Sequence, residues 1–325
     1  MLPPWRTQMR RTAQAQALLT RRQLNAAMNQ PIDVYKAVRA MRLWLMFQPM
    51  DGLLGMYQRH DGSAGMVLNV KVHPALQRYT AAHELGHHVL GHEVGIDPEH
   101  HIIGWSNLRE QETEAQLFAS EFLMPLAAIN AAARELGIRE GSIDAADVYQ
   151  LSLRLRTSYS AMITRLQMLE WITSAGARKL RAIAPKSLKR ELLGHALPDP
   201  RGDVWVVTDH AKGPIQPHVG DNVVFDLLET PSTGYRWDPE LPPGLSVHSD
   251  TFRLAEPGGE IPIGSPGHRR LEVNVEEPAT GQSRFTLRRP WDPEAVGGEL
   301  RVGVASTPRP TQGVDPRQMQ LPLPA

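Results

Sequence analysis

The chain has 325 residues, with 35 basic and 35 acidic side chains, 13 histidines and no cysteine. Because the charges balance, the composition gives no global reason for binding nucleic acid or an acidic membrane. The lack of cysteine excludes disulfides, thiolate metal ligands and a cysteine nucleophile. No run of about 18 apolar residues is present, so we expect no membrane-spanning helix and a cytoplasmic protein.

Composition divides the chain near residue 190. Of 27 prolines, 7 precede residue 181 and 20 follow it, whereas 11 of the 12 methionines precede it. Scarce prolines permit long helices, while frequent turn formers are typical of an all-β domain. We therefore expect a domain over residues 1–183, a linker with a short helix over 184–202, a β-sandwich domain over 203–306 and a disordered proline-rich tail over 307–325.

The pattern of apolar residues predicts an α+β first domain. Helices are expected at residues 5–28 and 32–42, strands at 43–47, 53–60 and 64–70 joined by Asp-Gly turns, and helices at 75–93, 109–122, 125–136, 144–155 and 159–174. In the second domain, strands are expected at 203–209, 221–229, 245–254, 269–277, 283–289 and 299–306. Their spacing by glycine and proline turns indicates a sandwich.

The strongest signal for chemistry is a motif that runs from His83 through Glu84 to His87. Residues i and i+4 share a helix face, so both imidazoles can reach one tetrahedral ion. Glu84 is placed to take a proton from an attacking water and to pass it to a leaving amine. A pattern this short also arises by chance on a histidine-bearing helix, so the interpretation requires a third ligand.

The helix expected at 109–122 offers this third ligand. Glu112 shares a face with the small residues Ala115 and Ala119, which would let this helix approach the motif closely. Glu114 lies on another face and is the second candidate. The histidines at 100–101 are further candidates, although a solvated loop position is the simpler interpretation of both.

Residues 77–93 and 110–125 together resemble the ImmA/IrrE family of metallopeptidases. That family shows Arg-Phe-Thr-x-Ala-His-Glu-x-Gly-His and then Glu-x-x-Ala-Asn-x-Phe-Ala-x-x-Leu-Leu-Met-Pro, and the resemblance covers about residues 28–172. It implies a zincin-like domain with helix-turn-helix-like helices. In this chain the resemblance assigns the zinc ligands to His83, His87 and Glu112, the catalytic base to Glu84, and a supporting position beside the ligands to Gln116, where the family has Asn or Asp. Mn²⁺ also suits such a ligand set.

The same resemblance implies a narrow substrate, a helix-turn-helix transcriptional repressor whose cleavage derepresses stress-response or mobile-element genes. The oxyanion of such a reaction needs a donor beyond the metal. Four residues are candidates, and the sequence does not choose among them: Tyr79, His88, Tyr159 and Arg165.

The segment 147–173 also has the pattern of a DNA-contacting helix pair, with Arg154, Arg156 and Arg165 close together. An apolar stripe through Leu151 and Leu155 favours packing on the peptidase core instead. Because the chain has no net charge and few lysines, we do not expect DNA binding.

Three loops of the expected sandwich resemble those of the chagasin-like inhibitors of papain-type cysteine peptidases. That family reads Asn-Pro-Thr-Thr-Gly-Tyr/Phe, Gly-x-x-Gly and Arg-Pro-Trp in its loops. The corresponding residues here are Thr230, Pro231, Ser232, Thr233, Gly234 and Tyr235, then Gly264 and Gly267, then Arg289, Pro290 and Trp291. The resemblance implies an immunoglobulin-like sandwich whose loops enter a peptidase cleft, with Thr230 and Ser232 as departures from the pattern. Packing at the sandwich end is the plainer interpretation of the loop aromatics.

Three functions are therefore open. The leading hypothesis is a zinc endopeptidase that regulates transcription, with the sandwich as a targeting or regulatory module. The alternative is a binding protein that inhibits cysteine peptidases and holds a structural metal, for which His88 or His92 would supply a fourth ligand. The third, a DNA-binding regulator without proteolysis, has the least support in the sequence.

Overall fold

The computed structural model describes residues 4–60, 63–92, 96–98, 110–139, 141–209, 213–254 and 265–309. These residues form two compact units. The first contains the chain up to Ala131 together with Leu155–Glu170, and the second contains Ala132–Arg154 together with Trp171–Arg309. The boundaries at 183 and 203 stay predictions. No described helix is both long and apolar enough to cross a membrane.

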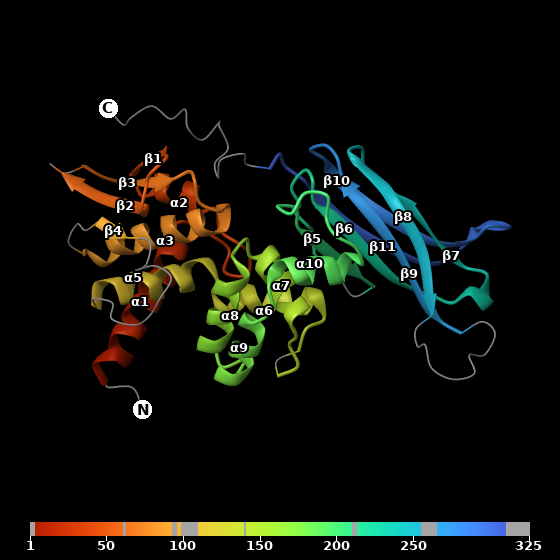
Figure 1. Cartoon of the computed structure of the whole chain (residues 1–325), viewed down its shortest axis with the longest axis horizontal. Helices are drawn as coiled ribbons and strands as arrows, with labels where there is room; N and C mark the ends of the chain where they lie inside the picture. Colours follow the sequence, from red (N-terminus) through yellow and green to blue (C-terminus); the bar gives the residue numbers. More distant parts are fainter. Residues whose placement is uncertain are drawn as a thin grey trace. The chain divides into compact units, whose positions relative to one another are not determined.

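The first unit is built on a four-stranded sheet in the order β1-β3-β2-β4. Strand β1 (Trp44–Gln48) runs parallel to β3 (Ser63–Asn69), and β2 (Leu53–His60) is antiparallel to β3 and to β4 (Ile96–Pro98). Helix α3 (Pro74–Leu90) lies between this sheet and α5 (Glu110–Leu123) (Figure 1). The other helices of the unit are α1 (Pro4–Gln23), α2 (Val34–Ala40), the first part of α6 (Leu126–Leu136) and α8 (Tyr159–Met168).

Helix α3 has clear signals at both ends. Pro74 occupies its first turn, and the His73 side chain accepts a hydrogen bond from the Ala75 amide at 3.2 Å. Gly91 adopts a φ of 72° just after the helix, a conformation that glycine takes at little cost. The helix therefore ends at Leu90, three residues earlier than the sequence pattern predicts.

The prediction of a single helix over residues 159–174 is wrong. The chain forms α8 and a separate α9 (Ser174–Arg181), because Glu170 takes a φ of 65° and Thr173 caps the second helix through the Gly176 amide. Strands β4 and β7 (Arg236–Glu240) were not predicted. The first has only three residues, and the second contains Pro239, which reads as a turn former.

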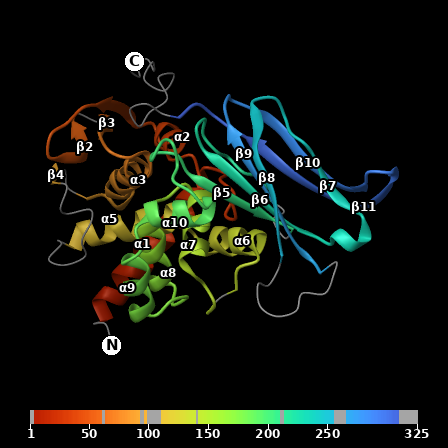
Figure 2. The ribbon, with the colours of Figure 1, turned by 45° about the vertical axis from the view of Figure 1, so that its right-hand side comes forward.

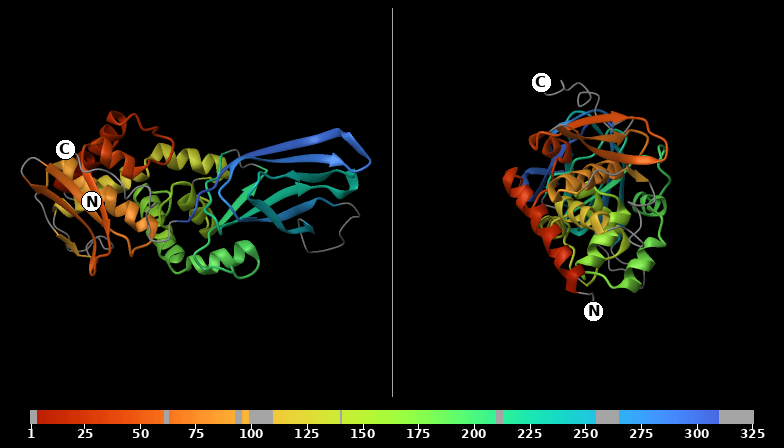
Figure 3. Two further views of the ribbon diagram at one scale, coloured as in Figure 1. Left: turned by 90° about the horizontal axis from the view of Figure 1, so that it is seen from above. Right: turned by 90° about the vertical axis from the view of Figure 1, so that its left-hand side faces the viewer.

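The second unit contains two sheets that pack as separate layers (Figure 3). One has the order β5-β6-β9-β8 and the other β11-β10-β7. Their strands are β5 (Val204–Thr208), β6 (Asn222–Glu229), β8 (Leu245–Leu254), β9 (Gly267–Val275), β10 (Thr280–Arg289) and β11 (Asp292–Ala305). Fifteen buried residues form the core, with the rings of Phe225 and Phe285 4.4 Å apart. The α+β class and the all-β sandwich expected from the sequence are confirmed.

Helices α7 (Ala145–Arg154) and α10 (Pro185–Leu193) belong to this second unit and lie near β5 (Figure 2). Leu193 forms a small buried cluster with Val204 and Val224. Gln150 donates to the Val204 carbonyl at 2.8 Å and accepts from the Val206 amide at 3.0 Å. The short helix expected in the linker is therefore packed on the sandwich.

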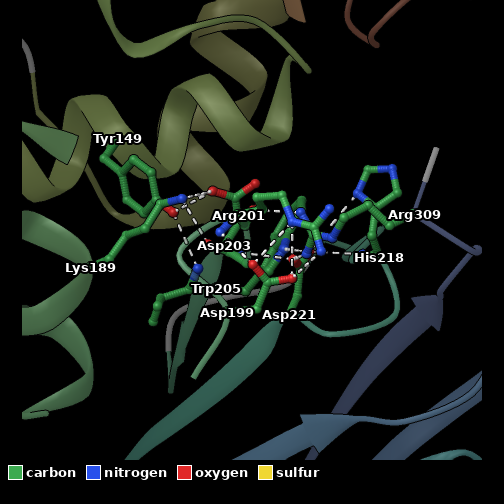
Figure 4. A network of polar contacts seen from close by, with 11 residues as sticks. Tyr149, Lys189, Asp199, Arg201, Asp203, Trp205, His218, Asp221 and Arg309 are labelled. Carbon is green, nitrogen blue, oxygen red and sulfur yellow. Dashed lines mark hydrogen bonds and ion pairs between the residues drawn. The ribbon is translucent and has the colours of Figure 1, made fainter. Parts of the chain in front are cut away.

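A polar network around Asp203 and Asp221 anchors these helices (Figure 4). The Asp203 carboxylate accepts from the Tyr149 hydroxyl at 2.8 Å and pairs with Lys189 at 2.9 Å. The buried Asp221 accepts from the Asp203 amide at 2.8 Å and also binds Arg309. Arg309, which the sequence assigns to the tail, is thus held by the sandwich, while residues 310–325 lie outside the described chain.

Candidate metal centre

Helices α3 and α5 cross at two small residues. A Cβ atom at Gly86 would lie 3.2 Å from the Cα and carbonyl oxygen of Ala115 and 3.1 Å from Phe118. The missing side chain therefore permits the close approach that the small-residue face predicts. Glu112 precedes Ala115 by about one helical turn, so the crossing brings its carboxylate to α3.

Three donor atoms gather at this crossing. The Nε2 atoms of His83 and His87 are 3.1 Å apart, and Glu112 Oε2 lies 3.3 Å from the first and 3.5 Å from the second. Ligands at about 2.0–2.1 Å from a tetrahedral ion are about 3.3 Å from one another. The residues present therefore fit one tetrahedral cation. The sequence predicts the same three residues, and their role as ligands stays a prediction.

The environment of the cluster is buried on the α3 side and more open at Glu112. His83 is fully buried and His87 is 6% exposed, whereas the Glu112 side chain is 15% exposed. Glu84 is also buried, and a Cβ at Gly55 of β2 would lie 3.3 Å from its Oε1 atom. Strand β2 thus passes close to the carboxylate predicted to act as a base.

His92 and Glu114 form a chain of polar contacts that begins at the His87 ring. His92 Nδ1 lies 3.1 Å from His87 Nδ1, and His92 Nε2 lies 3.0 Å from Glu114 Oε2. If His87 offers Nε2 to a cation, its Nδ1–H donates to His92, whose Nε2–H then donates to Glu114. Burial lowers the pKa of His92, which favours the neutral ring that this arrangement needs.

Glu114, the second candidate ligand, therefore contacts His92 rather than the three donor atoms. The sequence pattern identifies His92 only as a candidate fourth ligand and does not predict this supporting position. The signal is Gly91, whose turn directs the next residue back, so that the His92 amide bonds to the His87 carbonyl at 3.0 Å. Gln116 is buried on α5, and its predicted supporting role stays a prediction.

The candidate oxyanion donors differ in their contacts. His88 bonds to the Tyr57 hydroxyl at 2.9 Å, and burial lowers its pKa. The Tyr79 hydroxyl donates to the Gln116 carbonyl at 3.4 Å, and burial raises its pKa. Tyr159 is buried on α8. The histidines at 100–101 lie outside the described residues.

Two of the three arginines considered for DNA are buried. Arg165 is fully buried, donates to the Met124 carbonyl at 2.9 Å and pairs with Glu121 at 2.6 Å. Arg154 is 8% exposed and donates to the Pro214 carbonyl at 2.9 Å. Both guanidinium groups hold helices in place and are covered, so neither is presented to a phosphate.

The first and third chagasin-like loops meet at one end of the sandwich. The first forms a 3-10 turn, Pro231–Thr233, followed by Gly234 with a φ of 74°. A Cβ at Gly234 would overlap the Trp291 ring, so that ring lies against the glycine, and it is 71% exposed.

The remaining loop residues are divided between this end and the sheet. The Arg289 guanidinium lies 4.5 Å over the Tyr235 ring and donates to the Thr233 carbonyl at 3.2 Å. Thr230, Ser232 and Pro290 lie in the same two loops. Gly267 is a buried residue of β9, and Gly264 lies outside the described residues.

Comparisons with known proteins find two families. Residues 39–167 match the IrrE N-terminal-like domain of peptidase family M78, and residues 216–304 match the chagasin family of peptidase inhibitors, I42. No curated protein sequence matches the chain. The two resemblances expected from the motifs are confirmed.

Among solved structures, the chain is similar to the cysteine protease inhibitor EhICP2 from Entamoeba histolytica, at 24% identity over 34% of this chain and 100% of that one, with a TM-score of 0.31. It is also similar to amebosin, at 23% identity over 33% and 98% of the two chains, with a TM-score of 0.28. PbICP-C, solved in complex with falcipain-2, shows 15% identity over 33% and 91%, with a TM-score of 0.23.

Proposed function

We propose that this chain, which joins an IrrE-like metallopeptidase domain to a chagasin-like inhibitor domain, is a zinc-dependent endopeptidase. One observation carries the proposal: His83, His87 and Glu112 bring three donor atoms within 3.5 Å of one another, and Glu84, which follows His83 in the chain, is buried. Two imidazoles and a carboxylate are a ligand set of catalytic zinc sites, which leave a fourth position open.

His83 and His87 would hold the ion through their Nε2 lone pairs, and Glu112 through Oε2. When bound, zinc would polarise the scissile carbonyl and lower the pKa of water to about 7. The Glu84 carboxylate would take the proton from the attacking water and return it to the leaving nitrogen. Mn²⁺ would suit the same donors.

The positions of His88 and His92 support a catalytic rather than a structural site. His92 contacts the far nitrogen of the His87 ring and Glu114, while His88 contacts Tyr57. With these contacts neither histidine closes the coordination sphere as a fourth ligand.

We further propose that the substrate is a helix-turn-helix transcriptional repressor, and that its cleavage in the cytoplasm derepresses stress-response or mobile-element genes. This rests on the resemblance of residues 77–93 and 110–125 to the ImmA/IrrE family. The sandwich would then target or regulate the peptidase.

The test is a cleavage assay with the repressor encoded nearest the gene of this chain. Purified protein with Zn²⁺ or Mn²⁺ is expected to make a discrete, chelator-sensitive cut. Glu84→Gln should bind the metal normally and make no cut, whereas Glu112→Gln should lose both the metal and the cut. A cut that persists in Glu84→Gln would show that the assigned base is wrong.

A second candidate function is inhibition of papain-type cysteine peptidases. It is favoured by the exposed Trp291 ring, which lies against Gly234 beside the stacked Arg289 and Tyr235. Tryptophan, tyrosine and arginine are the residue types most enriched among the side chains that dominate binding energy at protein interfaces. Inhibition of papain by the full chain, weakened by Trp291→Ala and unaffected by Glu84→Gln, would establish it. No inhibition by the intact chain would remove it.

A further inference from the structure

We propose that His195, His248 and Glu272 form a second divalent-cation site, on the sandwich and independent of the peptidase centre. Each residue offers one ligand atom, and the three atoms lie within 4.8 Å of one another. The residues come from three separate segments: the loop after α10, strand β8 and strand β9. Two imidazoles and a carboxylate are donors that suit zinc, nickel, copper and cobalt.

The pair His195 and Glu272 has the hydrogen-bonding pattern of a ligand pair. His195 Nδ1 lies 3.2 Å from the Ala196 carbonyl, which can only accept, so Nδ1 carries the proton. His195 Nε2 lies 3.0 Å from Glu272 Oε2, so a proton on Nε2 or a cation held by both atoms can bridge the pair.

The Glu272 carboxylate is already oriented. Arg270 lies 3.7 Å from its Oε1 atom, while Oε2 is the atom directed at His195. Glu272 is 6% exposed, so its backbone and stem are fixed by the sheet, and one oxygen remains for a ligand. A carboxylate held in this way loses little freedom when a cation binds.

A β-bulge supplies the third donor. Along β8, Val247 pairs with Val273 and Ser249 pairs with Glu272, so His248 is an extra residue opposite one position of β9. Bulges turn a side chain away from the regular alternation of a strand. Here the His248 ring lies 6.2 Å from the His195 ring, centre to centre.

The rings have room to close on an ion. Both histidines are exposed, and the His195 side chain is 47% accessible. A tetrahedral ion would bring the three donors to about 3.3 Å from one another, which rotation of two exposed imidazoles can provide. The bound cation would tie the loop after α10 to two strands of the sandwich.

The same sheet offers a matched control. His268 Nδ1 lies 2.7 Å from Asp226 Oδ1, and the His268 side chain is 46% accessible, almost the same as that of His195. This pair has no third donor among the described residues that could hold a metal ion. The effect of removing His268 therefore measures how much metal an exposed histidine–carboxylate pair binds without a third donor.

The experiment is equilibrium dialysis of the full chain against Zn²⁺, repeated with Co²⁺ so that the visible absorption reports the coordination. Three variants are compared with the unmodified chain: His248→Ala, His268→Ala and His83→Ala/His87→Ala. If both centres bind, the unmodified chain holds two ions. We expect His248→Ala to weaken one of them at least about tenfold, because even the loss of an outer partner costs 10- to 100-fold. His268→Ala should change neither.

The double variant separates this proposal from the proposed function. It should retain one ion, and adding His248→Ala to it should weaken the binding of that ion at least about tenfold. If the peptidase centre bound no zinc, the unmodified chain would hold a single ion whose binding His248→Ala still weakens. Unchanged binding in His248→Ala, or an equal loss in His268→Ala, would overturn the second site. Because His248 is an exposed residue, circular dichroism of the variant should match that of the unmodified chain.

Discussion

Replacing Gly86 with alanine perturbs the crossing of α3 and α5 by a single methyl group. The new Cβ would lie 3.2 Å from the Cα and carbonyl oxygen of Ala115 and 3.1 Å from Phe118. Two of these neighbours are backbone atoms, which cannot rotate away. The two helices must therefore separate by a few tenths of an ångström, and Glu112 moves with α5.

The magnitude follows from two opposing effects. Alanine favours a helix over glycine by about 1 kcal/mol, whereas overpacking costs about 1–3 kcal/mol. The free energy of unfolding of the metal-free protein should therefore fall by about 0–2 kcal/mol. Ligand distances in metal sites keep within about 0.2 Å of their ordinary values, and a shift of Glu112 by a few tenths of an ångström exceeds that range. Because even the loss of an outer partner costs about 10- to 100-fold, zinc affinity should fall by at least about tenfold.

Gly176→Ala is the matched control, because Gly176 lies in α9 and its added Cβ would meet atoms no closer than 3.5 Å. This variant should gain up to about 1 kcal/mol of stability and keep its zinc affinity. Urea unfolding of the metal-free chains and competition with a zinc-binding dye measure both quantities. If Gly86→Ala gained stability as the control does and bound zinc unchanged, the close helix approach would not be what positions Glu112.

Three further outcomes are expected. Arg165→Met leaves the buried Glu121 carboxylate without its partner and should destabilise the chain by about 3–5 kcal/mol in urea, with recovery when Glu121→Gln is added. His92→Ala removes the hydrogen-bond acceptor of the His87 Nδ1–H group and should weaken zinc binding about 10- to 100-fold in the dye assay. The hydrogen bond from Arg269 lowers the pKa of Asp250, so the stability that this pair contributes is present above about pH 4 and lost as the pH falls through the lowered pKa. The difference in stability between the unmodified chain and Asp250→Asn should therefore shrink on acidification, and a difference that grows would contradict the assignment.

The parts of the site that follow local rules could be predicted from the sequence. The spacing of His83 and His87 places both on one helix face, and the small residues around Ala115 indicate a close crossing that selects Glu112. His92 was not recognised as a supporting residue because the helix was expected to continue to residue 93, whereas it ends at Leu90 and Gly91 turns the chain. The His248 position depends on a bulge, which leaves no periodic signal of its own.

The limits of the fold prediction have the same origin. The residue pattern of α7 is that of an ordinary amphipathic helix, and only the long-range hydrogen bonds of Gln150 to β5 show that it packs on the sandwich. The break at Glu170 depends on a left-handed backbone at a residue that seldom adopts it. The hydrogen bonds between Gln150 and β5 connect residues far apart in the chain and are therefore absent from local patterns.

The most direct test of a catalytic zinc site is the anomalous scattering of zinc-loaded crystals at the zinc absorption edge. In the first unit we expect one peak at about 2.0–2.2 Å from the Nε2 atoms of His83 and His87 and from a Glu112 oxygen, with the fourth position open to solvent. A peak surrounded by four protein side chains, for example with His92 as the fourth ligand, would indicate a structural site. A peak away from these three residues would contradict the ligand assignment itself.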